Sequence, residues 1–300
     1  MAKSDFDILM IGHFSNDLLV VDGAGEEAPG GAVYYGSIAL RRLGISVAVM
    51  TRMHPKDYPR LAPLREEGVT VFVEPAPETS GIENVYASSD MERRVCRPRA
   101  FAGPFQLRQV PDVRARVNLL VPVIAGEIDL PFLQAMAARG PVGMDVQGFV
   151  RVREGANLVF RQWPDMHAGL SCVTFLKADQ AEAELLTGEG NLESAAKALA
   201  EHGPREILLT QSAGVTVYAD GKFYHAPFRS RNLTGRTGRG DTCFAVYVAK
   251  RLTADPEEAC RWAAAVTTLK QERPGPWRGR SADVEAYWRG ASPTGRDERV

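Results

Sequence analysis

The sequence contains few cysteines and no long hydrophobic run. Its four cysteines form no CxxC pair and are scattered among 300 residues, at Cys96, Cys172, Cys243 and Cys260. This pattern argues against a disulfide framework or a zinc cage and is typical of a reducing compartment. The first apolar run, Ile8 to Ile11, ends at Gly12, far short of a signal peptide or a membrane span. We therefore expect a cytoplasmic protein without a membrane partner.

Neither sign of charge is in excess. The chain has 36 Lys and Arg against 37 Asp and Glu, a formal net charge of −1. Nothing in that balance fits a protein that covers a nucleic-acid backbone, so no nucleic-acid partner is expected. The hydrophobic content of 45% and the charged content of 24% exclude a largely disordered chain. A chain of 300 residues can fill one large α/β domain, or a core domain with a small appendage.

Several motifs of common enzyme classes are also missing. The chain has no GxxxxGKS/T, HExxH or GxSxG sequence, which argues against P-loop NTPases, zincins and α/β-hydrolases. No GxGxxG follows the first apolar run, which argues against a nicotinamide-dependent oxidoreductase. The functional class must therefore be sought in other patterns.

Apolar segments of strand length alternate with helical segments along most of the chain. The predicted strands are Ile8–Gly12, Ser46–Met50, Val69–Val73, Asn118–Val123, Val142–Asp145, Cys172–Leu176 and Glu206–Thr210. The predicted helices are Ala32–Leu43, Leu130–Arg139, Gln180–Leu186, Leu192–Glu201, Asp241–Leu252, Pro256–Lys270 and Ala282–Trp288. Continuous apolar strands that alternate with helices predict a mostly parallel sheet covered on both faces. Ligands of such sheets bind beyond the carboxyl ends of the strands.

Two stretches break the alternation. Leu18–Asp22 is predicted as a second strand directly after the first, and Gly81–Arg97 as a hairpin that turns near Ser88, Ser89 and Asp90. Together they predict a small sheet that projects over the main sheet as a lid. The hairpin segment also carries four arginines, which form either a solvated face or a contact to an anionic ligand. These are Arg93, Arg94, Arg97 and Arg99.

The most informative segment is LTGRTGRGDTCFAVYVAKRL, from Leu233 to Leu252. A glycine-rich turn runs directly into an apolar helix, so backbone N–H groups at the helix N-terminus point outward. The unpaired donors and the helix dipole both favour a bound anion. Asp241 falls in the first turn, where its carboxylate either caps the helix or accepts a proton from a hydroxyl that attacks a bound phosphate.

A second glycine pair, Gly30-Gly31, opens the predicted helix that ends at Leu43-Gly44. Paired glycines allow positive φ and a close approach of the backbone to a ligand. The two glycine segments, in this order, resemble those of the ribokinase-like (pfkB) family of carbohydrate kinases. The resemblance covers roughly Ile8 to Pro276, with Gly238-Arg239-Gly240-Asp241 in place of the family's late Gly-Ala-Gly-Asp.

The resemblance implies a fold and a reaction. The fold is a three-layer, mostly parallel α/β sheet with helices on both faces and a small β lid. The reaction is ATP-dependent phosphorylation of a hydroxyl group of a small sugar or polyol, with Mg²⁺. We assign residues 1–290 to one such domain, with lid strands at about 17–22 and 81–99, and residues 291–300 to a polar tail. Related kinases often dimerise through the lid, so a homodimer is expected by analogy.

The resemblance also assigns roles to residues. Asp241 is the expected catalytic base, and Gly238, Arg239 and Gly240 form the anion hole. The residues expected at the acceptor are Asp17, Gly30, Gly31, Tyr35, Asp145, Gln147 and Arg151. Those expected at ATP are Thr210, Gly214, Gly238 and Gly240. Those expected to bind the metal are Glu182 and Asp179, in a match to the family's Asn-x-x-Glu.

Five positions depart from the family pattern, including Gly235 and Arg236, which replace the residues that commonly precede the anion hole. Tyr35 stands where many sugar kinases have asparagine, so ribose or fructose specificity is in doubt; its ring either stacks on a substrate ring or packs in the core. Arg239 replaces a small residue and either neutralises a transferring phosphoryl group or points to solvent. Asp179 replaces asparagine and adds negative charge near the expected metal.

These departures leave several functions open beside the sugar kinase. The Tyr34-Tyr35 pair and the Asp145-to-Phe149 segment point to a branch away from ribokinase itself, and an inositol-type cyclitol kinase is one alternative within it. A nucleoside kinase of the same fold is an alternative, because aromatic side chains suit a nucleobase. A non-catalytic protein that binds a sugar or a nucleotide is the third interpretation, and Arg239 is the feature that supports it.

Overall fold

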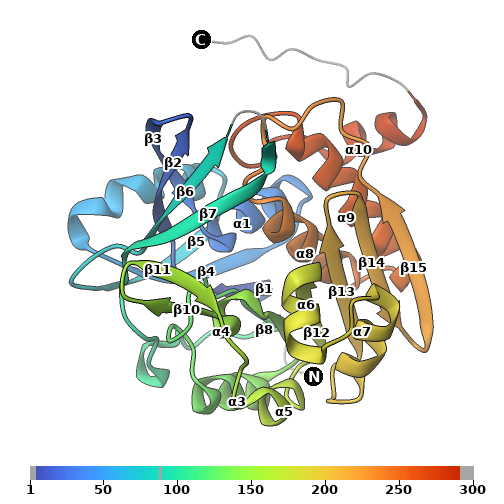
Figure 1. The fold of residues 1–300 in the computed structure, drawn as a ribbon, viewed down its shortest axis with the longest axis horizontal. Coiled ribbons are helices and arrows are strands. Elements are labelled where there is room, and N and C mark those ends of the chain that lie inside the picture. The colour runs from blue at the N-terminus through green and yellow to red at the C-terminus, as the bar shows by residue number, and fades with distance from the viewer. Residues whose placement is uncertain (1–4, 88–89, 291–300) are drawn as a thin grey trace.

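The protein is described here by a computed structural model that covers residues 5–87 and 90–290 (Figure 1). Its main sheet has nine strands in the order β15-β14-β13-β12-β9-β8-β1-β4-β5. The strands are β1 Phe6–Ile11, β4 Val47–Met53, β5 Thr70–Pro75, β8 Ala115–Leu120, β9 Val142–Asp145, β12 Phe175–Asp179, β13 Glu206–Gln211, β14 Gly214–Ala219 and β15 Lys222–Pro227. All neighbours from β13 to β5 pair in parallel, whereas β14 and β15 are antiparallel. The predicted mostly parallel sheet is confirmed.

Helices cover both faces of this sheet. They are α1 Ala32–Arg42, α2 Ala62–Glu66, α3 Leu130–Arg139, α4 Gln147–Val150, α5 Met166–Leu170, α6 Gln180–Thr187, α7 Leu192–Ala200, α8 Arg239–Lys250, α9 Pro256–Gln271 and α10 Ser281–Trp288, with short 3₁₀ helices at Pro55–Leu61 and Leu107–Gln109. Ile8 and Met10 of β1 pack in a core cluster with α1, α8 and α9, whereas Leu9 and Ile11 pack in a second cluster with α3, α6 and α7. Because alternate side chains of a strand point to opposite faces, β1 is buried on both sides.

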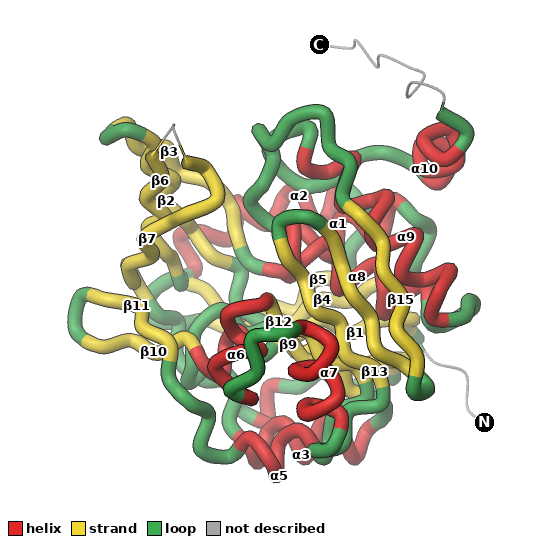
Figure 2. Tube along the Cα trace, turned by 45° about the vertical axis from the view of Figure 1, so that its right-hand side comes forward, coloured by secondary structure: helices red, strands yellow, loops and turns green. Residues whose placement is uncertain are grey.

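The predicted lid is a separate sheet of four strands in the order β3-β2-β6-β7. These are β2 Ser15–Val21, β3 Ala24–Gly30, β6 Gly81–Ala87 and β7 Asp90–Ala100. Figure 2 shows this sheet standing out from the main sheet, with the hairpin of β10 (Arg151–Glu154) and β11 (Asn157–Phe160) next to it. Residues 88–89 of the predicted turn and the predicted tail 291–300 lie outside the described residues. No helix in the described ranges is long and apolar enough to cross a lipid bilayer.

Two of the four lid arginines form ion pairs, and the side chains of the other two are not described. Arg97 pairs with Glu83 across the hairpin at 3.1 Å, and Arg99 pairs with Glu27 of β3 at 3.4 Å. The side chains of Arg93 and Arg94 lie outside the described part of the chain. Arg97 and Arg99 thus contribute to the solvated lid surface through exposed ion pairs, which add little stability.

Candidate functional site

A cavity of about 840 Å³ lies at the carboxyl ends of the central strands, between the main sheet and the lid. It is bordered by β2, β6, β7 and β11 on one side and by the turn before α8 on the other. Thirteen of the predicted site residues line it: Asp17, Gly31, Tyr35, Asp145, Gln147, Arg151, Asp179, Glu182, Thr210, Gly238, Arg239, Gly240 and Asp241. The fold thus brings together segments that are far apart in the sequence.

The glycine-rich turn before α8, residues 235–238, leads into the helix and can bind an anion together with its first turn; we call it the anion turn. Gly238 is the N-cap residue of α8, with φ +82, so Asp241 does not occupy the capping position. The first N–H groups of a helix have no partner within the helix, and here the residues that carry them line the cavity. A Cβ atom at Gly238 would lie closer than 3.0 Å to the ring of Tyr35. The turn therefore requires glycine both for its conformation and for space.

The ring of Tyr35 packs against this turn. Its side chain is 4% exposed, and its hydroxyl donates to the carbonyl of Pro29 at 3.3 Å. Because one face of the ring lies against Gly238, Tyr35 supports the anion turn from α1. Of the two roles expected for Tyr35, core packing is the one that these contacts describe.

Lys177, which was not predicted, lies at the centre of the buried charges. Its Nζ is 3.1 Å from Oδ1 of Asp145 and 3.5 Å from Oε2 of Glu182. Burial disfavours its charge, but the carboxylates of Asp145 and Glu182 outweigh burial and raise the pKa of Lys177 above its ordinary value. A Cβ atom at Gly240 would lie 3.6 Å from Nζ, so the ammonium group sits beside the first turn of α8. A permanent positive charge is thereby placed where a phosphate would bind.

Asp179 and Glu182 form a reciprocal cap at the start of α6. Oδ1 of Asp179 accepts from the N–H of Glu182 at 2.8 Å, and Oε2 of Glu182 accepts from the N–H of Asp179 at 2.7 Å. Burial raises the pKa of Glu182 to about 7, although Lys177 acts in the opposite direction. Among the described residues, no three His, Cys, Asp or Glu side chains converge as metal ligands. Mg²⁺ needs only one or two carboxylates besides water and substrate phosphates, so this pair fits a water-bridged Mg²⁺.

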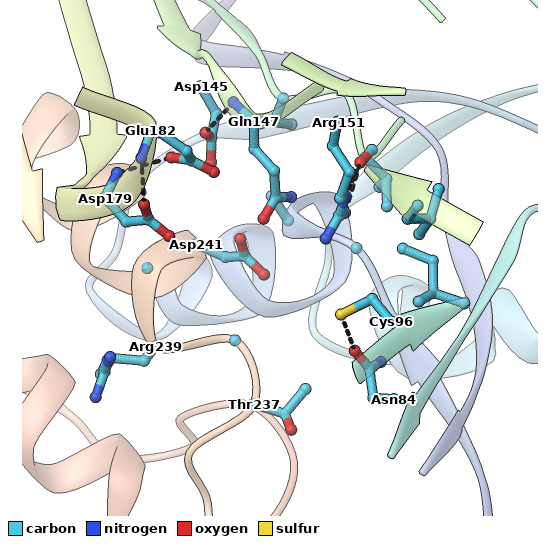
Figure 3. Close-up of a pocket in the computed structure, with 18 of the residues that line it drawn as sticks. Asn84, Cys96, Asp145, Gln147, Arg151, Asp179, Glu182, Thr237, Arg239 and Asp241 are labelled. Atoms are coloured by element: carbon cyan, nitrogen blue, oxygen red, sulfur yellow. Dashed lines mark hydrogen bonds between the residues drawn. The ribbon is translucent and has the colours of Figure 1, made fainter. Parts of the chain in front are cut away.

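The opposite end of the cavity offers polar groups of several kinds. Oδ1 of Asp17 accepts from the N–H of Ile82 in the lid at 3.0 Å, and Gly30 leaves room for the second carboxylate oxygen. The guanidinium group of Arg151 donates through Nε to the carbonyl of Val123 at 2.9 Å. In the lid, the thiol of Cys96 donates to Oδ1 of Asn84 at 3.3 Å. Figure 3 shows Asp241 between the Asp179–Glu182 pair and the side chains of Arg151 and Cys96.

Two predicted site residues, Gly30 and Gly214, are not among the described residues that line the cavity. Gly30 packs directly behind Asp17. Gly214 pairs with Pro227 in the β14–β15 hairpin, where a side chain would collide with the carbonyl of Ala226. At the end of the cavity near Thr210, the lining instead includes Arg236 and Arg239.

His13 and Glu127 form a second buried polar pair outside this cavity. Both are 0% exposed, and Glu127 accepts from the backbone N–H groups of His13, Val123 and Ile124 at 3.1, 2.7 and 2.8 Å. Burial raises the pKa of Glu127 to about 7 and lowers that of His13 to about 3. The pair joins the loops that follow β1 and β8, and so fixes the strand ends that border the cavity.

Signals for the residues that were missed are weak in the sequence. Lys177 is a charged residue within an otherwise apolar strand, and Arg236 precedes Gly238 in the anion turn. Asn84, Cys96 and the β11 residues reach the cavity only because the lid and the β10–β11 hairpin fold over it. No motif marks them.

Comparisons with known proteins agree with this geometry. The profile of the "pfkB family carbohydrate kinase" matches residues 16–278. A search of the curated proteins finds no match. A solved pyrophosphate-dependent kinase in the ribokinase family, complexed with a pyrophosphate analog and myo-inositol, is 36% identical, with a TM-score of 0.87 over 93% of this chain and 99% of that one.

Two further solved structures are similar to this chain. A pyrophosphate-dependent myo-inositol-1 kinase, converted into a myo-inositol-3 kinase by two substitutions, is 35% identical, with a TM-score of 0.86 over 93% of this chain and 98% of that one. An Arabidopsis thaliana ribokinase complexed with ribose and ATP is 18% identical, with a TM-score of 0.72 over 93% of this chain and 97% of that one, and shares the fold. With the anion turn, the site carboxylates and the family profile in agreement, the chain belongs to the pfkB family of carbohydrate kinases.

Proposed function

We propose that this kinase transfers a phosphoryl group from pyrophosphate to a hydroxyl group of a cyclitol such as myo-inositol. The observation that carries the choice of donor is the cationic lining of one end of the cavity. Arg236 and Arg239, on either side of Gly238, and Lys177, whose Nζ lies beside Gly240, all line the cavity. Pyrophosphate is small and highly charged, so it depends on such side chains, and arginine binds phosphate oxygens in a bidentate manner.

The loop between β15 and α8 is tied to the end of α9, where the N–H of Arg229 donates to Oγ1 of Thr268 at 3.1 Å. The N–H of Gly235 likewise donates to the carbonyl of Gln271 at 2.8 Å. None of the described residues from 211 to 235 lines the cavity. The segment that holds Gly214, which the sequence predicted to contact ATP, thus contributes no wall to the cavity, and this favours a donor without a nucleoside.

The acceptor end supports a compact polyhydroxylated ring. Asp17, Gln147, Arg151 and Asn84 line it from four different elements, and together they offer donors and acceptors of hydrogen bonds. A ring with a hydroxyl on every carbon requires such groups on several sides. Two of the solved relatives act on or bind myo-inositol, and two substitutions convert one of them from a myo-inositol-1 kinase into a myo-inositol-3 kinase. In that relative, few side chains thus suffice to change how a cyclitol is phosphorylated.

In the proposed reaction, Asp17 orients the acceptor and Asp241 accepts the proton of the attacking hydroxyl. The oxygen forms a bond to phosphorus while the bond to the bridging oxygen of pyrophosphate breaks, and the released phosphate takes up the proton from Asp241. The N–H groups at the start of α8, with Lys177, stabilise the charge on the transferred group. Mg²⁺, bound through water by Asp179 and Glu182, would neutralise part of the donor's charge.

The test compares donors and acceptors with the full chain. Pyrophosphate or ATP is mixed with Mg²⁺ and with myo-inositol, other cyclitols, ribose, fructose or adenosine, and the product is detected by ³¹P NMR. We expect turnover with pyrophosphate and a cyclitol, and we expect Asp241→Asn to reduce kcat by about 10²–10⁴. Asp165→Asn, at an exposed position without a capping hydrogen bond, is the matched control.

Each of the other outcomes would favour a different function. Turnover with ATP alone would restore the donor predicted from the sequence, and turnover with adenosine alone would indicate a nucleoside kinase. Binding of pyrophosphate without turnover on any acceptor would favour the non-catalytic interpretation. Full activity of Asp241→Asn would overturn the base assignment.

A further inference from the structure

Lys270 is a buried lysine that lies next to the site without lining the cavity. It is at the end of α9, is 2% exposed, and its Nζ donates to the carbonyl oxygens of Gly235 and Thr237. Its ammonium group also lies 4.9 Å from the centroid of the Tyr35 ring. All three contacts belong to the anion turn or to the ring that supports it.

Burying an ammonium group is unfavourable, so its position needs a reason. Burial lowers the pKa of Lys270 to about 7, and the negative charge of Asp241 acts in the opposite direction. Two carbonyl oxygens and an aromatic face are neutral partners, so they compensate only part of the lost hydration. A neutral side chain of the same shape would avoid this cost. The reason for a lysine at this position is therefore sought in what its hydrogen bonds to the two carbonyl groups do.

The geometry of the peptide group shows what these hydrogen bonds do. In a trans peptide, the carbonyl of one residue and the N–H of the next point in opposite directions. The carbonyl of Thr237 points to Lys270, away from the cavity, because Lys270 lies behind the turn. The N–H of Gly238 therefore points to the cavity side, where the donor phosphate would bind.

We propose that Lys270 is a positioning residue for phosphoryl transfer. Its ammonium group holds the carbonyls of Gly235 and Thr237 so that the turn presents the N–H of Gly238 to the transferred phosphoryl group. Tyr35 closes the other side of this arrangement. The proposal rests on the phosphoryl transfer proposed above, but not on the identity of the donor.

The experiment compares three variants with the wild-type enzyme in steady-state kinetics and thermal unfolding. Lys270→Met removes the charge and the hydrogen bonds, and Lys270→Gln keeps N–H donors without a charge. Lys250→Met is the control: Lys250 is a half-buried lysine at the end of helix α8, and its Nζ lies 3.4 Å from the centroid of an aromatic ring, that of Trp262, outside the cavity.

We expect Lys270→Met to lower kcat by about tenfold to a hundredfold, less than the loss of an anion-hole donor itself. The KM for the acceptor should stay near the wild-type value, because the acceptor end is untouched. Lys270→Gln should fall between Lys270→Met and the wild type, and Lys250→Met should keep the wild-type kcat. The melting temperatures of the variants should not follow this order. If Lys270 had only a structural role, kcat would instead fall in proportion to the loss of folded protein.

A kcat of Lys270→Met within about threefold of wild type, or a loss no larger than the loss of folded protein, would overturn the proposal. If Lys270→Met does not fold, Lys270→Gln decides alone: a reduced kcat with an unchanged acceptor KM supports positioning, and an unchanged kcat refutes it. An inactive wild-type enzyme would count only against the proposed function. Calorimetric titration with pyrophosphate would then decide, with weaker binding by Lys270→Met supporting the role and equal binding refuting it.

Discussion

Replacing Gly238 by alanine should damage both stability and activity, through two separable effects. The positive φ of +82 costs an L-residue about 1–2 kcal/mol. The new Cβ would also overlap the ring of Tyr35, and overpacking of this kind costs about 1–3 kcal/mol. Lys270 lies over the same ring, so Tyr35 cannot simply move aside. The free energy of unfolding should therefore fall by about 2–5 kcal/mol.

The measurement is urea unfolding followed by tryptophan fluorescence, together with kcat/KM. Gly221→Ala is the control, because Gly221 has φ +74 and a methyl group at this position would meet no described atom within 4 Å, so only the conformational cost applies there. In the Gly238→Ala background, Tyr35→Leu should recover part of the lost stability by making space, a coupling of at least about 1 kcal/mol. If Gly238→Ala costs no more than Gly221→Ala, the contact with Tyr35 does not constrain the turn and the reasoning is wrong.

Two further predictions concern charge. Arg239→Met should raise the KM for pyrophosphate by about tenfold to a hundredfold through the loss of a charged hydrogen bond, whereas exposed Arg229→Met should not; equal KM values would remove Arg239 from the donor site. Glu127, with its pKa raised to about 7, contributes stability that is present below about pH 4.5 and lost as the pH rises through about 7. Compared with wild type, Glu127→Gln should therefore become less destabilising across that window, by up to roughly 3 kcal/mol. His13 has the opposite pH dependence but is present in both proteins, so urea unfolding at several pH values isolates Glu127, and a difference that does not change with pH would contradict its raised pKa.

The parallel strands could be predicted because a strand that is buried on both faces has a continuous run of apolar residues. All four residues from Ile8 to Ile11 are 0% exposed in β1. Several antiparallel strands were missed, including β14 and β15 of the main sheet. β3 has the sequence AGEEAPG and is held by its register with β2, and the short β10 and β11 pair only with each other. Their formation depends on partners that no local pattern reveals.

The site shows the same division. Gly238 and Asp241 could be found because a turn with positive φ and a carboxylate in the first turn of a helix leave a local pattern. Lys177 was missed because the strand was expected to end at Leu176, which left the lysine in a loop. β12 instead runs from Phe175 to Asp179, and pairing of Lys177 with Asp145 in the neighbouring strand buries the ammonium group among carboxylates. An error of three residues in the predicted end of a strand thus decides whether a lysine is predicted to face solvent or to belong to the site.

Tyr35, Gly238 and Lys270 explain why the departure at position 35 does not disrupt the anion turn. They come from α1, the turn before α8 and the end of α9, and the ring of Tyr35 contacts both of the others. The backbone N–H groups that bind an anion are the same for every residue type, so a sequence reveals only that glycine permits the turn. The direction of these N–H groups depends on tertiary contacts. The ring of Tyr35 fills the space beside Gly238, and Lys270 donates to the carbonyl groups of the turn. Asparagine at position 35 would leave that space unfilled and the ammonium group without its aromatic face. The turn therefore packs against the tyrosine, and we propose that Tyr35 supports the anion turn and does not select the acceptor.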